Sequence, residues 1–344
     1  MGKVIRIGLG IILVVALIAG YLLYSRVFLA NGVPNTDGKI VVEIPTGSTF
    51  EDVVAMLKNK GIVRDAFTFE YLADYMNYKK DPMRAGRFEL VPGWNGVDVI
   101  RHLRNGKQAP VRLVLSMERL TEEVAGKAAS FIEADSTDLW EVFQDEAFIA
   151  ELGYTPETLM SLFIPNTYEV YWNMDGRAFL KRMKKEHEAF WSKKGRAVAA
   201  KSLGLTPAEV YTLASIVERE TTHQPEKPRM AGVYLNRLEQ GILLQADPTS
   251  VFARRDFSTT RVTNYHTQYD SPYNTYMYAG LPPGPISMAS ISSIDAVLNA
   301  EDHDYIFFCS KGDGSGVHAF AKSLEQHNRN AQRYRQNLRK RGLR

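Results

Sequence analysis

The residue best suited to acid–base chemistry is Glu218, near the end of a predicted helix. Thr206 and Pro207 mark the start of that helix, because a hydroxyl caps its free amides and proline is favoured at the first helical position. Glu218 follows an apolar stripe of helical period within residues 210–217. A carboxyl at the edge of such a stripe is poorly solvated, so we expect its pKa to be raised, as a general acid at neutral pH requires. The position also fits a solvated glutamate at a helix end, and Glu220 is expected to point elsewhere into solvent.

Downstream segments supply polar groups that could hold a substrate near that carboxyl. A second predicted helix begins at Pro228 and ends before Gly241, and the loop 244–249 that follows combines amide, carboxylate and hydroxyl groups. The stiff loop 280–286 holds three prolines and two glycines, which suits the wall of a binding groove or a purely structural turn. The predicted substrate-positioning residues are Gln245, Asp247, Asn274, Tyr276 and His318.

Other chemistries find little support in the sequence. The seven histidines form no His-x-x-x-His pair and there is no Cys-x-x-Cys, so we expect no metal site and no cofactor. A Gly-x-Ser-x-Gly elbow is also missing, which argues against a serine hydrolase. A net charge of +3 gives no argument for a nucleic-acid partner, and the single cysteine, Cys309, lies in an apolar run typical of a buried strand.

The N-terminus predicts a membrane anchor. Ile7 to Ser25 is a run of 19 uncharged residues, long enough at ~1.5 Å per residue to cross a bilayer core. A cleaved signal peptide is the alternative, but its apolar region is usually shorter, about 7–15 residues. Lys3 and Arg6 precede the run and Arg26 follows it, which predicts an inner-membrane protein with a cytoplasmic N-terminus and the bulk of the chain outside the cytoplasm.

The rest of the chain, which is long enough for about two domains, predicts an α+β protein. After the stub and anchor (1–29), residues 30–39 are rich in Gly, Pro, Asn and Asp and predict a linker. Residues 40–130 contain strand–helix units that recur after about 46 residues, with a weaker third copy from residue 111. Residues 131–344 predict a mixed α+β catalytic domain, mostly helical at first and closing with two short strands and a basic helix.

Several blocks resemble one known family. The runs IVERET, AGVYLNRL, LQADPT and YNTY…GLPPGPI resemble, in order, the endolytic murein transglycosylases of the MltG (YceG-like) family. The resemblance implies a membrane-anchored enzyme that cuts peptidoglycan glycan strands, with Glu218 as the catalytic glutamate, and peptidoglycan synthases as partners. It also implies that residues 40–130 are LysM-like repeats that contact glycan, with Trp94 and Tyr75 as candidate stacking residues, although a structural spacer is equally open. The chain departs from the family pattern after Glu220, within the LQAD loop and at residues 287–290, which puts substrate subsites in doubt more than the reaction.

The implied reaction needs a single carboxyl. The acid would protonate the glycosidic oxygen between N-acetylmuramic acid and N-acetylglucosamine, and would then accept the proton of the muramic C6 hydroxyl as a 1,6-anhydro end forms. Two alternatives stay open. A hydrolytic muramidase would use Asp247 to hold a water molecule or to attack the sugar. A non-catalytic glycan-binding scaffold of the wall-synthesis machinery would need no acid at all.

Overall fold

The computed structural model describes residues 2–343, apart from the side chains of residues 3–5, 23 and 27. The chain divides into two compact units. Unit 1 comprises residues up to 112 together with 131–134 and 169–174, and unit 2 comprises 113–130, 135–168 and 175–344. All described strands belong to two-stranded sheets, and helices predominate, so the fold is mixed α+β as predicted.

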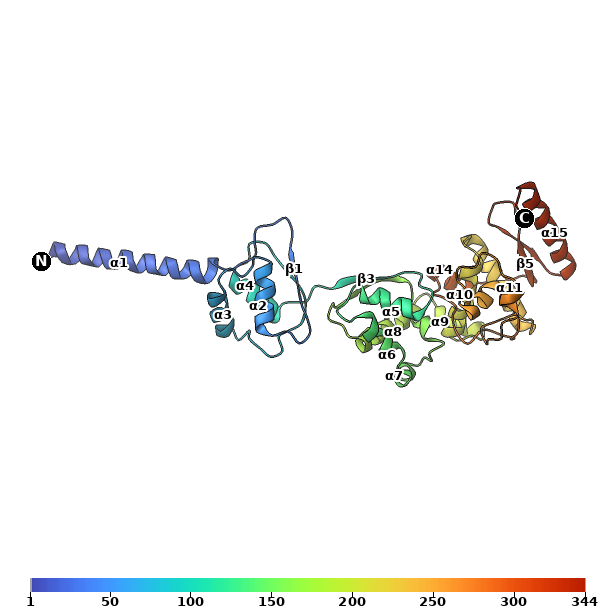
Figure 1. Ribbon diagram of the computed structural model, residues 1–344, viewed down its shortest axis with the longest axis horizontal. Helices are drawn as coiled ribbons and strands as arrows, with labels where there is room; N and C mark the ends of the chain where they lie inside the picture. The colour runs from blue at the N-terminus through green and yellow to red at the C-terminus, as the bar shows by residue number, and fades with distance from the viewer. Residues whose placement is uncertain (1, 344) are drawn as a thin grey trace. The chain divides into compact units, whose positions relative to one another are not determined.

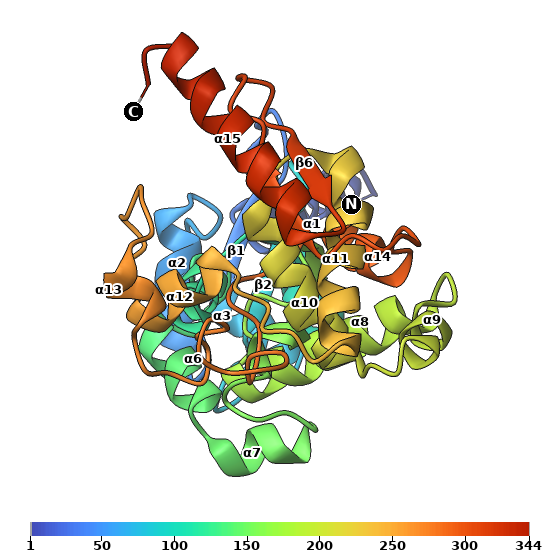
Figure 2. The same ribbon diagram turned by 90° about the vertical axis from the view of Figure 1, so that its right-hand side faces the viewer.

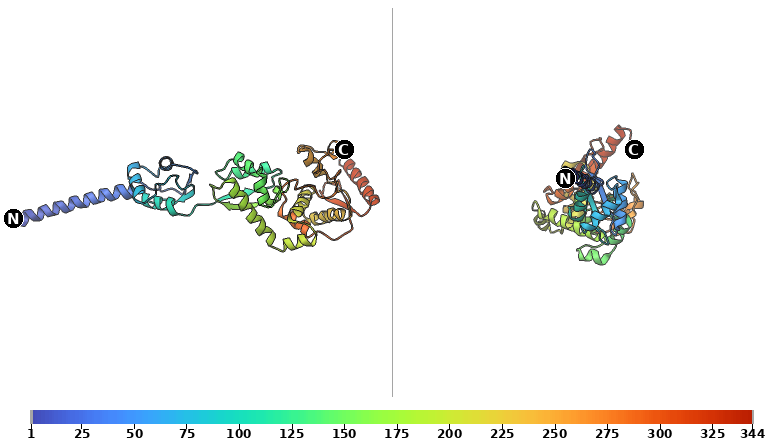
Figure 3. Two further views of the ribbon diagram at one scale, coloured as in Figure 1. Left: turned by 90° about the horizontal axis from the view of Figure 1, so that it is seen from below. Right: turned by 90° about the vertical axis from the view of Figure 1, so that its left-hand side faces the viewer.

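The N-terminal helix α1 (Gly2–Tyr24) is continuous and leads into a short π-helix, η1 (Ser25–Leu29) (Figure 1, Figure 3). The predicted membrane span includes residue 23, and the charge argument includes Lys3, whose side chains lie outside the described set. Within the part of the chain that is described, no helix is both long enough and apolar enough to cross a membrane. The anchor therefore stays a prediction.

Unit 1 is built around one antiparallel strand pair. Its remaining elements are β1 (Ile40–Ile44), α2 (Phe50–Asn59), α3 (Ala66–Tyr75), β2 (Gly86–Leu90) and α4 (Gly96–Asn105). The first two predicted strand–helix repeats contain β1 and β2. These strands pair from Ile40↔Leu90 to Ile44↔Gly86 and share one hydrophobic core. The third predicted copy instead contributes strand β3 (Val111–Leu115) and helix α5 (Thr121–Ala129), mostly in unit 2. A repeat of sequence pattern thus corresponds here to two halves of one core rather than to separate modules.

The predicted linker is partly packed into unit 1. Asn31 is buried, and its side-chain oxygen accepts hydrogen bonds from the backbone N–H groups of Arg64 and Asp65, both at 2.9 Å. Val33 joins the core, and Gly32 makes an isolated bridge with Asn95. The prediction of a linker rested on a composition of polar and turn-forming residues, which flexible segments also have. In this segment, however, the polar side chain of Asn31 forms hydrogen bonds with backbone groups of unit 1.

Unit 2 carries the candidate site. It opens with β3 (Val111–Leu115), which pairs with β4 (Asn166–Val170), and closes with the β5 (Phe307–Ser310) and β6 (His318–Ala321) hairpin. The C-terminal helix α15 (Leu324–Lys340) lies against that hairpin (Figure 2). Between them lie α5 (Thr121–Ala129), α6 (Ser136–Phe143), α7 (Glu146–Glu151), the 3-10 turn η2 (Leu159–Leu162), α8 (Gly176–Ser192), α9 (Arg196–Ser202), α10 (Pro207–Glu220), the 3-10 turn η3 (Gln224–Glu226), α11 (Lys227–Glu239), α12 (Asp247–Arg254), α13 (Asn264–Thr267) and α14 (Ile291–Leu298).

Helix α10 is the centre of unit 2. The predicted start is confirmed, because Thr206 and Glu209 form a capping box and Pro207 is the first helical residue. Every residue from Val210 to Val217 is buried, and α10 packs against α9, α11, α12 and α14. Rigid packing on all sides fixes the direction in which the last turn of α10 presents its side chains.

Candidate active site

The last turn of α10 presents two glutamates with opposite environments. Glu218 and Glu220 lie two residues apart, so their side chains leave the helix about 200° apart at ~100° per residue. One of them therefore faces α11 and α14, and the other faces a solvent-accessible cavity. The sequence alone assigned the acid to Glu218 and solvent to Glu220.

Glu218 belongs to a buried polar network. Its Oε2 accepts hydrogen bonds from the Ser290 and Ser293 hydroxyls, the latter at 2.6 Å, and from Lys227 Nζ at 3.0 Å. The Lys227 side chain is only 1% exposed. Burial raises the pKa of Glu218, but the two serine hydrogen bonds and the lysine charge outweigh it and lower the pKa below its ordinary value. The expected raised pKa is thus wrong for this residue, and Glu218 stays ionised as the partner of a buried lysine.

Glu220 has the properties that the sequence sought in Glu218. It lines two cavities, and Tyr234 Oη donates a hydrogen bond of 2.7 Å to its Oε1. Burial raises the pKa of Glu220 to about 7, and the negative charge of Asp247 adds to this effect, whereas the Tyr234 hydrogen bond opposes it. A carboxyl that titrates near neutrality can both donate and accept a proton at working pH. The expectation that Glu220 is solvated is therefore wrong.

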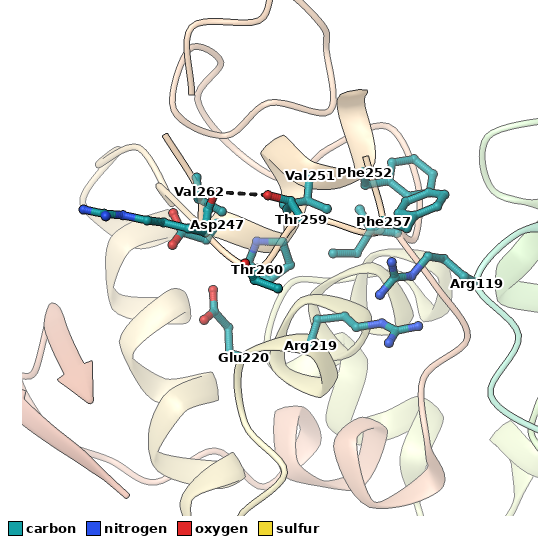
Figure 4. Close-up of a pocket in the computed structure, with 13 residues that line it drawn as sticks. Arg119, Arg219, Glu220, Asp247, Val251, Phe252, Phe257, Thr259, Thr260 and Val262 are labelled. Atoms are coloured by element: carbon teal, nitrogen blue, oxygen red, sulfur yellow. Dashed lines mark hydrogen bonds between the residues drawn. The ribbon is translucent and has the colours of Figure 1, made fainter. Parts of the chain in front are cut away.

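The two cavities meet at Glu220 and Asp247, which line both of them. The first cavity, of about 310 Å³, is drawn in Figure 4, where the Glu220 and Asp247 carboxylates face the same space. Its other lining residues are Arg119, Arg219, Pro248, Val251, Phe252, Phe257, Thr259, Thr260, Arg261, Val262 and Ile286. The second cavity, of about 470 Å³, is also lined by Arg237, Leu244, Gln245, Tyr276, Phe307, Phe308, Cys309, Ser310, His318, Leu324 and His327. An extended polymer could thus contact protein on both sides of the two carboxylates.

The loop before α12 is held in a fixed conformation beside Glu220. Gln245 has a φ of 51°, a left-handed backbone that a non-glycine residue rarely adopts, and its N–H donates to the Thr275 carbonyl at 3.0 Å. Asp247 is the first residue of α12, and Tyr276 Oη donates to its Oδ1 at 2.5 Å. Burial first, and then this hydrogen bond, raise the pKa of Tyr276, so the phenol remains a donor. The loop therefore sets the Asp247 carboxylate at the junction of the cavities.

The predicted positioning residues separate into two groups. Gln245, Asp247, Tyr276 and His318 line the second cavity, so the structure brings them together. Asn274 is fully buried, and its side-chain nitrogen donates to the carbonyls of residues 266, 267 and 269. Asn274 thus stabilises the loop 266–276 and contacts neither cavity. His318 also bonds Glu226 through Nδ1 at 3.1 Å, which fixes its ring at the cavity edge.

Sequence reasoning considered Glu220 only as a possible partner carboxylate of Glu218, and it missed four residues around Glu220. The missed residues are Arg119, Arg219, Tyr234 and Arg237. One signal for Glu220 was available, because it lies at i+3 from Val217 and i+7 from Leu213 and so continues the apolar stripe itself. Arg119 precedes the two glutamates of α10 by about a hundred residues, and no sequence spacing could have placed it in the same cavity. Among the described residues, no group of three His, Cys, Asp or Glu side chains could hold a metal ion.

The fold and the site define a candidate acid–base enzyme, in which one near-neutral carboxyl lies where two cavities meet. Residues 42–333 match the YceG-like family, so the chain belongs to that family. This confirms the resemblance inferred from the sequence blocks.

Known relatives support this assignment over nearly the whole chain. A Bacillus subtilis protein named endolytic murein transglycosylase is 27% identical over 339 residues, covering 92% of this chain and 91% of the relative. A Streptococcus pneumoniae protein of the same name is also 27% identical, but this chain spans only 58% of its length. The crystal structure of a putative YceG-like protein from Listeria monocytogenes is similar with a TM-score of 0.56 and 29% identity, covering 86% of this chain and 99% of that one.

Proposed function

We propose that this protein is an endolytic lytic transglycosylase that cleaves peptidoglycan glycan strands, with Glu220 rather than Glu218 as the acid–base residue. The observation that carries the proposal is the position of Glu220 at the junction of two cavities, with a pKa of about 7. The names of the relatives support murein as the substrate. Two cavities that continue on both sides of the acid suit cleavage within a strand.

In the proposed mechanism, protonated Glu220 donates its proton to the glycosidic oxygen as the bond to C1 of N-acetylmuramic acid breaks. The resulting carboxylate then accepts the proton of the C6 hydroxyl of the same sugar, which attacks C1 and closes the 1,6-anhydro ring. The proton gained balances the proton given, so the acid is regenerated without water. The ionised Asp247 would stabilise the positive charge that develops at C1, while Tyr234 orients the acid.

The test is mass spectrometry of purified glycan strands after incubation with the wild type, Glu220→Gln and Glu218→Gln. The proposal expects internal fragments with anhydro ends from the wild type and none from Glu220→Gln. Glu218→Gln should retain cleavage in proportion to the fraction that remains folded, because Glu218 bonds Lys227 and lines neither cavity. Full activity of Glu220→Gln would contradict the assignment and return the role to Glu218.

A second candidate is a hydrolytic muramidase, favoured by one observation. Asp247 lines both cavities with Glu220, so two carboxylates share the site, as glycosidases require. The ends of the fragments separate the two reactions, since hydrolysis adds water and leaves reducing ends in place of anhydro ends. A wild type that binds strands without cutting them would instead support the scaffold alternative.

The cellular setting is also a proposal. We propose that the chain is anchored in the inner membrane through Ile7–Ser25, with the N-terminus cytoplasmic, and that peptidoglycan synthases are its partners. Apolar side chains along α1, such as Ile12 and Leu17, are exposed by 67% and 65%, which supports a lipid environment. Protease protection of N- and C-terminal tags in spheroplasts tests the orientation, because only the C-terminal tag should be digested.

Glycan contact by unit 1 is a further part of the proposal. Trp94 lines a cavity of about 360 Å³ with Asp98, Arg101 and His102, and such a mixture of an aromatic face with polar groups suits a sugar ring. Tyr75 is 80% exposed and does not line this cavity, so Trp94 is the better candidate. Strand binding by Trp94→Ala measures the contribution of this unit.

A further inference from the structure

Three arginines line the first cavity, and none of them has a carboxylate partner among the described residues: Arg261, and the pair Arg119 and Arg219. Arg119 comes from the loop between β3 and α5, and Arg219 comes from α10, between the two glutamates. Neither makes an ion pair within 4 Å among the described residues, whereas Arg255, which lies outside this cavity, pairs with Glu122 at 2.5 Å. Figure 4 shows both guanidinium groups at one end of the cavity, opposite Glu220.

The surroundings hold these two groups in place without neutralising them. Arg119 stacks over the Phe257 ring, 4.5 Å from its centroid, which leaves the N–H groups at its edge available. Arg219 Nε donates to the Ser287 hydroxyl at 3.2 Å, and no partner of its terminal nitrogens lies among the described residues. Burial first, and then the positive charge of Arg119, lower the pKa of Arg219. Two like charges that face one cavity repel each other until an anion binds between them.

Neighbouring carboxylates cannot serve as that anion. Glu218 is bonded to Lys227 and two serines, and Glu123 accepts hydrogen bonds from the backbone N–H groups of residues 119 and 120. Glu220 is partly protonated near neutral pH because its pKa is about 7. Asp247, which also lines this cavity, accepts a hydrogen bond from Tyr276 and forms no ion pair with either arginine, so we infer that the anion comes with the ligand.

The second cavity offers no equivalent site. Its arginine, Arg237, donates to the carbonyls of Ile306, Leu243 and Leu244 at 2.6, 2.9 and 2.9 Å. These hydrogen bonds occupy its guanidinium with backbone groups, and no other arginine or lysine lines that cavity among the described residues. The positive charge thus distinguishes one side of Glu220 from the other.

We propose that Arg119 and Arg219 bind a carboxylate of the peptide substituent carried by muramic acid, so that the enzyme selects strands that still bear their peptides. The inference rests on the proposed function, because the strand must lie along the cavities past Glu220. Arginine binds carboxylates with paired, charge-assisted hydrogen bonds, and of the two sugars only muramic acid carries a peptide. The pair therefore assigns the side of the first cavity to a muramic acid and gives the site a direction along the strand.

The test measures binding in the Glu220→Gln background, so its outcome does not depend on catalysis. Full-length protein in detergent is titrated with three preparations of glycan strands: peptide-bearing strands, the same strands with peptide carboxyls amidated, and strands stripped of peptide by an amidase, which keep a free lactyl carboxylate. Peptide-bearing strands should bind about 10- to 100-fold more tightly than amidated strands, the range of a charged hydrogen-bonded pair. Arg119→Gln and Arg219→Gln should remove this preference, and Arg255→Gln, outside the first cavity, should retain it.

Two other outcomes contradict the proposal, and a third separates it from the proposed function. A preference that survives in both variants refutes the role of the arginine pair. Stripped strands that bind as tightly as peptide-bearing strands, with both weakened by the variants, would assign the pair to the lactyl carboxylate instead. Arg119→Gln alone keeps the test valid if Arg219→Gln fails to fold, because the Arg119 side chain has only its contact with Phe257 to lose. A retained preference without any cleavage by the wild type would refute the proposed function and leave this inference standing.

Discussion

The same substitution at two positions in one helical turn should change stability in opposite directions. Glu220 has a pKa of about 7, against an ordinary value of 4.5. A raised pKa means that the folded state holds a proton that the unfolded state has lost, so the wild type loses stability as pH rises from about 4.5 through 7. That interval corresponds to about 3 kcal/mol at ~1.4 kcal/mol per pH unit, which is an upper limit because the side chain is partly exposed to water.

Replacing Glu220 by Gln removes this penalty. We expect Glu220→Gln to be more stable than the wild type by about 1–3 kcal/mol at pH 8 and nearly equal to it at pH 4. Glu218→Gln should behave in the opposite way, because its pKa is lowered and its charge offsets that of the buried Lys227. Removing one partner of a buried ion pair costs about 3–5 kcal/mol, so Glu218→Gln should be less stable than the wild type at pH 8. This stability difference should shrink as the pH falls below 4.5, the ordinary pKa of a glutamate, because the wild-type carboxyl then gains a proton.

Urea-induced unfolding between pH 4 and pH 8, followed by tryptophan fluorescence and by hydrogen exchange of α10 amides, measures both effects. Hydrogen exchange assigns the change to unit 2, since each of the two compact units can unfold separately. If Glu220→Gln were destabilised at pH 8 as much as Glu218→Gln, or if its advantage did not vary with pH, the assignment of the near-neutral carboxyl to Glu220 would be refuted.

Three other perturbations test the same site. Tyr234→Phe removes the hydrogen bond that lowers the pKa of Glu220, so the alkaline limb of the pH–rate profile should move up by about one unit, whereas Tyr278→Phe, whose hydroxyl bonds the exposed Asp270, should leave it unchanged. Asp247→Asn removes a charge that raises the pKa of Glu220, so kcat should fall while the alkaline limb moves to lower pH; a limb that moves up would contradict this. Asn274→Ala leaves three carbonyls without the amide that donates to them, so the free energy of unfolding should fall by about 1–3 kcal/mol, measured by thermal or urea unfolding. KM should change only through the conformation of the loop 266–276.

Local sequence signals predicted the scaffold well. The cap at Thr206, the proline at Pro207 and the helix-ending Gly241 define α10 and α11 to within about two residues, because capping depends on neighbouring groups in the chain. Gln245 and Asp247 line the second cavity, since they follow α11 directly, and their role in binding substrate stays a prediction. Such features are local, so the sequence contains most of the information that fixes them.

The environment of each glutamate could not be predicted in the same way, because it depends on segments far apart in the chain. Ser290 and Ser293, some 70 residues beyond α10, are what keep Glu218 ionised, and Arg119, a hundred residues before it, is what makes the first cavity positive. Helical periodicity does favour Glu220 over Glu218 as the buried carboxyl, since Glu220 continues the apolar stripe and Glu218 lies beside it. A carboxyl on the stripe must be either paired or neutral, and the only hydrogen-bond donor to Glu220 among the described residues is the uncharged Tyr234. Near-neutral titration of Glu220 is therefore a consequence of where the stripe ends, and the proposed acid–base residue belongs to the same helix that forms the core.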